Sequence, residues 1–160
     1  MPPETGRFLA LLANMAPNGS FIEVGTSAGY SSLWISLACR NRAVRLKTYE
    51  VLENKIKLAS ETIARTKSED YIELVSGDAR DHLGSLNTIS FCFLDATSDA
   101  YMDVYDKVVP KLVTGGILVA DNAISHFSEI ESVVKRAEDD CRVDSTIIDV
   151  GKGEMVVVKK

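Results

Sequence analysis

Short apolar runs alternate with amphipathic segments along most of the chain, and this alternation predicts an α/β protein. The runs expected to be strands cover residues 21–24, 44–49, 72–76, 89–94 and 117–120. The run at 89–94 is apolar almost throughout, as is typical of a central parallel strand buried on both faces. Between the runs, apolar residues recur at helical spacing. The sequence therefore predicts helices near 8–15, from 33–38 onward, and near 52–66, 98–112 and 127–137.

The end of the chain has a different pattern. Residues 143–150 and 155–158 both favour strands, and Gly151-Lys152-Gly153 between them favours a tight turn, so we expect an antiparallel hairpin. With the preceding elements, this predicts a three-layer α/β/α, Rossmann-like fold. Its seven-stranded sheet is mostly parallel and has an antiparallel C-terminal hairpin. The length fits one domain over residues 1–160.

The first predicted strand runs into a glycine turn. Gly25 and Gly29 lie four residues apart, and a helix is expected after them. Glycine lets the backbone turn sharply and approach a ligand, and the first turn of the helix offers free N–H groups. The spacing is not the G-x-G-x-x-G of dinucleotide sites. Glu23, two residues before Gly25, suits a cationic ligand such as a sulfonium bearing an ammonium group. The alternative is a glycine turn with only a structural role.

The stretch EVGTSAGYSS resembles the first motif of the class I S-adenosylmethionine-dependent methyltransferases. It is most similar to the O-methyltransferase family that includes catechol and caffeoyl-CoA methyltransferases. The segment ETGRFLALLANMAPNGSFIEVGT also resembles this family, and the resemblance runs from about Glu4 to Lys159. It implies S-adenosylmethionine as cofactor. The residues of the glycine turn expected to bind the cofactor are Glu23, Gly25, Thr26, Ser27, Gly29 and Ser31. Of these, Gly25, Thr26, Ser27 and Ser31 would hold its methionine part.

Acidic residues follow the next two predicted strands. Glu50 lies 21 residues after Gly29, where an acid at the end of the second strand can accept both ribose hydroxyls. We expect Val51 beside it to contact the cofactor as well. The resemblance assigns the adenine amino group to Asp78, with Gly77 and Ala79 as neighbours. The alternatives are a helix-terminal acid for Glu50 and a helix N-cap for Asp78.

Two further strands also end in acids, at Asp95 and at Asp121-Asn122. All these strand ends should face one crevice. Asp95, Asp121 and Asn122 offer only oxygen ligands, which suit Mg²⁺ or Ca²⁺. In the resembling family, residues at these places hold a divalent ion that binds both oxygens of a catechol-like substrate. The alternative is that the two aspartates only cap the helices that follow.

One family residue is absent. The family usually has a lysine three residues after the acid that ends the fourth strand, where it helps to deprotonate the acceptor, and this chain has Ser98 there. Asp95 is then the expected catalytic residue and is also expected to contact the cofactor. The base is left open between Asp99, Tyr101, His126 and ion-assisted proton loss. Family members also carry earlier helices that cover the substrate and build a dimer, so a homodimer stays open.

Composition narrows the function classes. A formal charge of −5 and a pI near 5.1 argue against a nucleic-acid surface. No apolar stretch reaches membrane-spanning length, and no secretory signal is apparent. The three cysteines, Cys39, Cys92 and Cys141, are odd in number and lack metal-ligand spacing. They indicate free thiols in a reducing cytoplasm, which is where we expect the protein.

The sequence thus favours methyl transfer from S-adenosylmethionine to an oxygen of a small-molecule acceptor, with a divalent ion orienting the acceptor. Two alternatives stay open. One is a metal-independent methyltransferase acting on another acceptor, and the other is a non-catalytic S-adenosylmethionine-binding module. A nicotinamide-dependent oxidoreductase is disfavoured by Glu23, by the glycine spacing and by the terminal hairpin, which is typical of the methyltransferase sheet.

Overall fold

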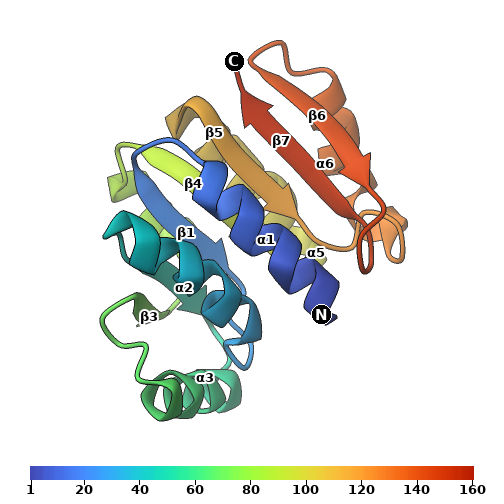
Figure 1. Ribbon diagram of the computed structural model, residues 1–160. Helices are drawn as coiled ribbons and strands as arrows, with labels where there is room; N and C mark the ends of the chain where they lie inside the picture. The colour runs from blue at the N-terminus through green and yellow to red at the C-terminus, as the bar shows by residue number, and fades with distance from the viewer.

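The computed structural model describes residues 1–160 and contains one seven-stranded sheet (Figure 1). Along the sheet the strands run in the order β3-β2-β1-β4-β5-β7-β6. The pairs from β3 to β5 are parallel, whereas β7 is antiparallel to both β5 and β6, which confirms the predicted mostly parallel sheet and its C-terminal hairpin. The strands are β1 (Ser20–Val24), β2 (Leu46–Glu50), β3 (Ile72–Ser76), β4 (Ile89–Leu94), β5 (Leu112–Ala120), β6 (Val143–Ile148) and β7 (Glu154–Lys159).

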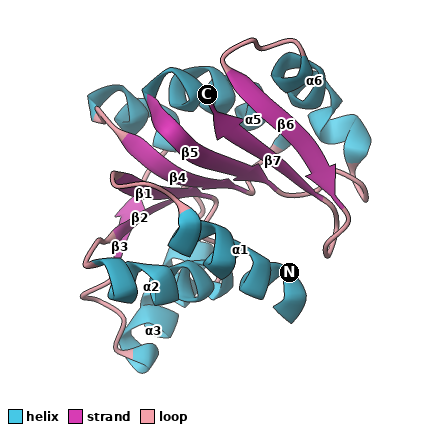
Figure 2. Cartoon of the chain, turned by 45° about the horizontal axis from the view of Figure 1, so that its top comes forward, coloured by secondary structure: helices cyan, strands magenta, loops and turns pink.

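Helices cover both faces of this sheet, which gives the three predicted layers. Figure 2 shows α1, α2 and α3 on one face, and α5 and α6 on the other. A short helix, α4, packs beside α5. The helices are α1 (Pro3–Met15), α2 (Tyr30–Arg42), α3 (Glu53–Thr66), α4 (Ala79–His82), α5 (Ser98–Val108) and α6 (Phe127–Glu138).

The sheet divides the hydrophobic core into two clusters, one on each face, and β4 contributes side chains to both. All six of its residues are buried. Because successive side chains of a strand point to opposite faces, Phe91 and Phe93 pack with α1 and α2, whereas Cys92 and Leu94 pack with α5 and α6. A strand buried on both faces has no polar side to alternate with, which explains its continuous apolar run.

The fifth strand is longer than predicted. We expected a helix to residue 112 and a strand only from 117, with a turn at Thr114-Gly115-Gly116. The helix instead ends at Val108, and a short 3₁₀ turn containing Pro110 leads directly into β5 at Leu112. The glycines lie within the strand, where the register with β4 shifts and Gly115 has φ +76°. This is a bulge, which adds residues to one strand without ending the pairing.

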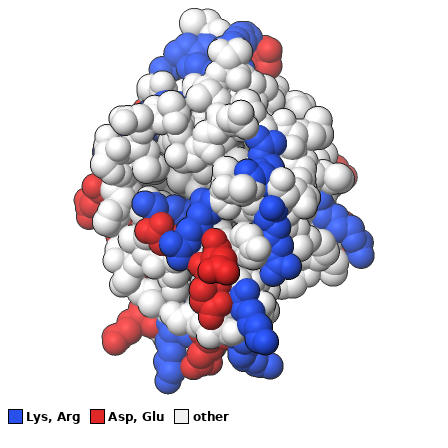
Figure 3. All heavy atoms as spheres, turned by 60° about the vertical axis from the view of Figure 1, so that its left-hand side comes forward, with Lys and Arg blue, Asp and Glu red and all other residues white.

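The surface charges and the lengths of the helices describe the outside of the molecule. On the face in Figure 3, Lys and Arg side chains are interspersed with Asp and Glu. None of the helices combines the length and apolar character needed to cross a bilayer.

Candidate functional site

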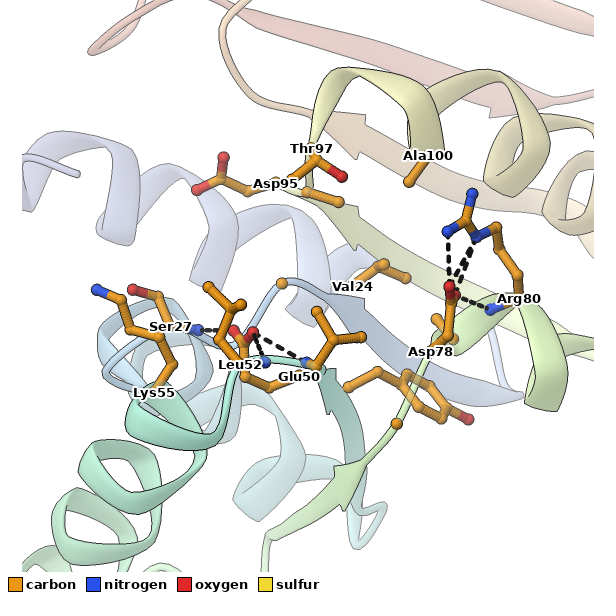
Figure 4. A pocket seen from close by; sticks show the side chains of 16 residues that line it. Val24, Ser27, Glu50, Leu52, Lys55, Asp78, Arg80, Asp95, Thr97 and Ala100 are labelled. Atoms are coloured by element: carbon orange, nitrogen blue, oxygen red, sulfur yellow. Dashed lines mark hydrogen bonds and ion pairs between the residues drawn. The ribbon is translucent and has the colours of Figure 1, made fainter.

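A cleft opens at the carboxyl ends of the parallel strands β1 to β4 (Figure 4). This is the edge where an open α/β sheet binds its ligands. The structure brings eight of the predicted site residues together in its lining: Gly25, Ser27, Glu50, Val51, Gly77, Asp78, Ala79 and Asp95. Six others lie behind or beside the lining: Glu23, Thr26, Gly29, Ser31, Asp121 and Asn122.

The turn after β1 is tightly bound to the neighbouring strand ends. Gly25 has φ +96°, and a Cβ there would overlap the carbonyl group of Asp95 at the end of β4. The N–H groups of Gly25 and Thr26 both donate to the Tyr49 carbonyl, at 3.0 and 3.2 Å. Glycine is therefore required at position 25 for both its backbone conformation and this close approach.

Glu50, the last residue of β2, forms the centre of the cleft floor. Its Oε2 accepts the Ser27 N–H at 2.8 Å. Its Oε1 accepts the N–H groups of Val51 at 2.9 Å and Leu52 at 3.0 Å. Three backbone donors thus fix the carboxylate in one orientation while the side chain still lines the cleft. A carboxylate offers about four acceptor positions, so one position on Oε2 remains for a ligand donor.

Glu23 supports the turn from below and does not line the cleft. Its side chain is fully buried, and its Oε2 accepts hydrogen bonds from the hydroxyls of Ser32 and Thr48, while Oε1 has no partner. Burial raises the pKa of Glu23 to about 7, against the lowering effect of these hydroxyl donors. Thr48 also bonds Thr26 at 2.6 Å between the two hydroxyl oxygens, so Glu23 contributes by positioning the glycine turn.

Asp78 lies at the opposite end of the cleft from Asp95 (Figure 4). It caps α4 through the Arg80 N–H at 2.8 Å, which is the capping alternative raised by the sequence. The Arg80 guanidinium also binds this carboxylate, and the hydrogen bonds from Arg80 hold the pKa of Asp78 below its usual range. Sequence reasoning missed Arg80, because nothing local marks an arginine as the partner of a residue two positions earlier.

Asp95, Asp121 and Asn122 are neighbours, as the sequence predicts. The Asn122 side-chain amide donates to Asp95 Oδ1 at 3.2 Å and to the Tyr101 hydroxyl at 3.3 Å. Asp121 is buried and its Oδ1 accepts the Asn122 N–H at 2.6 Å. The contact follows from β4 and β5 being adjacent parallel strands that end side by side.

The suggested bases differ in their surroundings. Tyr101 is buried, and burial raises the pKa of its hydroxyl well above its usual value. Asp99 is exposed and paired with Arg80 at 3.3 Å. His126 bonds its neighbour Ser125 through Nδ1 at 2.9 Å. None of these three side chains lines the cleft.

Glu154, at the start of β7, is a further acid at this end that the sequence did not reveal. It is fully buried, and neither carboxyl oxygen has a hydrogen-bond donor. Burial, reinforced by Asp121 and Asp95, raises the pKa of Glu154 to about 9. Burial and the charge of Asp121 likewise raise the pKa of Asp95 to about 6, while Lys152 opposes this. The signal available in the sequence was that Glu154, a charged residue, comes directly before an apolar run.

Asp95, Asp121 and Glu154 resemble a cation site in the chemistry of their side chains but not in how these side chains are arranged. The donors are all oxygens. Burial and repulsion between neighbouring carboxylates raise the pKa values of Asp95 and Glu154, and a bound cation would favour their ionised forms. No three His, Cys, Asp or Glu side chains, however, converge on one point in this structure. The oxygen donors are of the type that a hard divalent ion prefers. To bind one, the side chains of this group would have to move closer together than they are in this structure.

Comparison with known proteins gives consistent matches. A family profile described as O-methyltransferase matches residues 1–160. A catechol O-methyltransferase of Niastella koreensis is 30% identical over 127 residues, which cover 76% of this chain and 57% of that protein. The O-methyltransferase imqG of Aspergillus flavus is 27% identical over 169 residues, covering 91% of this chain and 68% of that one.

Solved structures share the fold at low sequence identity. The O-methyltransferase from Bacillus cereus, in complex with SAH (S-adenosylhomocysteine), has a TM-score of 0.84 at 23% identity, covering 100% of this chain and 82% of that one. TomG from Streptomyces achromogenes, in complex with SAM (S-adenosylmethionine), has a TM-score of 0.83 at 22% identity, covering 100% and 81%. These neighbours confirm the Rossmann-like methyltransferase fold. The profile match over residues 1–160 shows that the chain belongs to the O-methyltransferase family.

Proposed function

We propose that this protein transfers the methyl group of S-adenosylmethionine to a hydroxyl oxygen of a small-molecule acceptor. In this reaction the sulfonium S–CH₃ bond breaks, a C–O bond forms, and the acceptor hydroxyl loses its proton. S-adenosylhomocysteine leaves as the neutral thioether. Alignment of oxygen, methyl carbon and sulfur supplies much of the rate enhancement in such a displacement. Membership of the O-methyltransferase family supports this proposal.

The observation that carries the proposal is the Glu50 carboxylate, held by three backbone N–H groups in the cleft floor. An acid fixed at the end of the second strand suits ribose hydroxyls. In this assignment, a ribose hydroxyl donates to the position on Oε2 that Ser27 leaves free. The glycine turn then holds the methionine part on one side, through Gly25 and Ser27 in the cleft lining and Thr26 and Ser31 next to it. Asp78 and Ala79 hold the adenine on the other.

The acceptor is assigned to the end of the cleft near Asp95. There Asp95, Asp121 and Asn122 would hold a divalent ion such as Mg²⁺ or Ca²⁺. Such an ion, when bound, would orient the acceptor hydroxyl and lower its pKa. The buried, mutually repelling carboxylates and their oxygen-only donor set support this assignment. Ser98 leaves no lysine at the family position to act as base.

The reaction is tested with methyl-labelled S-adenosylmethionine and catechol, by following label in the methylated product. We expect turnover by the full chain, and a loss of at least about tenfold in kcat/KM for Glu50→Gln, because the neutral amide is a weaker acceptor for hydroxyl donors. Glu53→Gln, an exposed glutamate in the first turn of α3, is the matched control and should retain activity. Equal activity of Glu50→Gln and wild type would contradict the role of Glu50.

The role of an ion is tested separately. Activity should fall on treatment with EDTA, return with Mg²⁺, and be lost in Asp121→Asn. Full activity in EDTA would leave the methyltransferase assignment standing and replace the ion-assisted form with a metal-independent one. Cofactor binding without turnover of catechol or of any other hydroxyl acceptor would instead favour a non-catalytic cofactor-binding module.

A further inference from the structure

The Asp78 end of the cleft contains an ion-pair network that the proposed reaction does not use. The Arg80 guanidinium folds onto the Asp78 carboxylate, with Nε 2.9 Å and Nη2 2.7 Å from Oδ2 (Figure 4). Its Nη1 faces the other way and lies 3.3 Å from Asp99 and 3.6 Å from Asp103. Asp78 follows β3, while Asp99 and Asp103 belong to α5, so one side chain joins the cleft wall to a neighbouring helix.

This network fixes the chemical state of Asp78. Arginine has five N–H donors in a rigid plane, and here they are directed to three carboxylates. On its Oδ1, Asp78 also accepts the Arg80 backbone N–H at 2.8 Å and the shared Nε–H at 3.1 Å. Three N–H groups thus restrain the carboxylate, and about one of its four acceptor positions, on Oδ1, remains for a ligand donor. The hydrogen bonds from Arg80 keep the pKa of Asp78 low, which means that its oxygens only accept hydrogen bonds.

A fixed acceptor discriminates between purines. The edge of adenine presents an amino group that donates a hydrogen bond, whereas hypoxanthine presents a carbonyl oxygen at the same place. Opposite an ionised carboxylate, the amino group gains a bond and the carbonyl oxygen meets a like partial charge. With three carboxylates against one guanidinium, this end of the cleft is also negative in sum, which further disfavours a carbonyl.

We propose that Arg80 is the positioning residue that makes the cofactor site selective for adenine, by holding Asp78 as an oriented, ionised acceptor. The inference rests on the proposed function, since it takes Asp78 as the residue facing the nucleobase. Without Arg80, the Asp78 carboxylate would lose its orienting partner and face Asp99 and Asp103 uncompensated. It would then rotate away or take up a proton, and a protonated carboxyl can donate to a carbonyl oxygen.

The test compares S-adenosylhomocysteine with S-inosylhomocysteine by calorimetric titration of the full chain. Wild type should bind the adenine compound at least about 30-fold more tightly, because the inosine analogue sets a carbonyl oxygen against the carboxylate where adenine donates an N–H. In Arg80→Gln this ratio should fall below about fivefold. Arg80→Lys keeps the charge without the planar fork and should give an intermediate ratio. Asp103→Asn, which removes only an outer partner, should stay within about twofold of wild type.

The outcomes distinguish a failure of the role of Arg80 from a failure of the proposed methyltransferase function. Binding of the adenine compound by wild type with an unchanged ratio in Arg80→Gln overturns the role of Arg80 and leaves the methyltransferase proposal intact. Equal binding of both compounds by wild type does the same. Binding of neither overturns both. If Arg80→Gln does not give a folded thermal transition, Arg80→Lys decides, and a wild-type ratio in that variant overturns the inference.

Discussion

Replacing Glu23 with glutamine tests how the glycine turn is supported. The native carboxyl is fully buried with a pKa raised from 4.5 to about 7. Between these values the unfolded chain has released the proton and the native protein still holds it. The native state therefore binds more protons, and the free energy of unfolding falls as the pH rises. The stabilising effect of the protonated form is complete at low pH and lost by about pH 8.

The magnitude follows from the shift. Each unit of pKa difference corresponds to about 1.36 kcal/mol, so the full effect of Glu23 is about 3.4 kcal/mol, of which about 2.5 kcal/mol falls between about pH 5 and about pH 8. Glutamine keeps an acceptor oxygen for Ser32 and Thr48 but does not ionise. For a chain of this size, 2.5 kcal/mol corresponds to roughly 5–10 °C in Tm.

The assay is urea unfolding of wild type and Glu23→Gln across this pH range at constant ionic strength. The substitution itself adds a difference in the free energy of unfolding that does not depend on pH. Beyond that constant difference, the two free energies should agree toward low pH, and the variant should become more stable than wild type by about 2.5 kcal/mol toward high pH. Glu61→Gln, an exposed glutamate on α3, should follow wild type throughout. A difference between Glu23→Gln and wild type that does not change with pH would refute the reasoning.

Two further predictions concern stability. Gly25→Ala should destabilise the fold by at least about 3 kcal/mol and abolish cofactor binding, since its Cβ would meet the Asp95 carbonyl at φ +96°; denaturant unfolding with unchanged stability would contradict this. Asp140→Asn should destabilise by about 1.5 kcal/mol, because the buried Asp140 accepts Arg142 at 2.8 and 2.6 Å while Arg142 itself is partly exposed to solvent. A thermal melt shifted by less than about 2 °C would contradict that expectation.

Much of the fold follows from local patterns in the sequence. The apolar run of β4 and the helical spacing in α5 and α6 report burial directly, because each face that packs into the core must be apolar. The glycine turn could be recognised because Gly25 meets a backbone requirement that few other residues satisfy. The strand β5 was placed too late because Gly115 and Gly116 suggest a turn, and only pairing with β4 reveals the bulge.

The site was less completely predictable. Glu50, Asp78, Asp95 and Asp121 could be placed at one edge because parallel strands end together. The pairing of Arg80 with α5 and the burial of Glu154 depend on distant segments meeting, which no local pattern encodes. Glu23 was expected to contact the ligand, but its carboxylate is used inside the protein. The sequence gives residue types at the strand ends, and the fold decides which of them face the cleft.

The most direct test of the central claim is a calorimetric titration of S-adenosylmethionine into the purified chain. The account predicts saturable binding of about one cofactor per chain, with Kd on the order of micromolar. Glu50→Ala should weaken it by at least about tenfold, because the fixed ribose acceptor is lost. Absence of binding to the folded wild-type protein, or equal affinity in Glu50→Ala, would contradict the account.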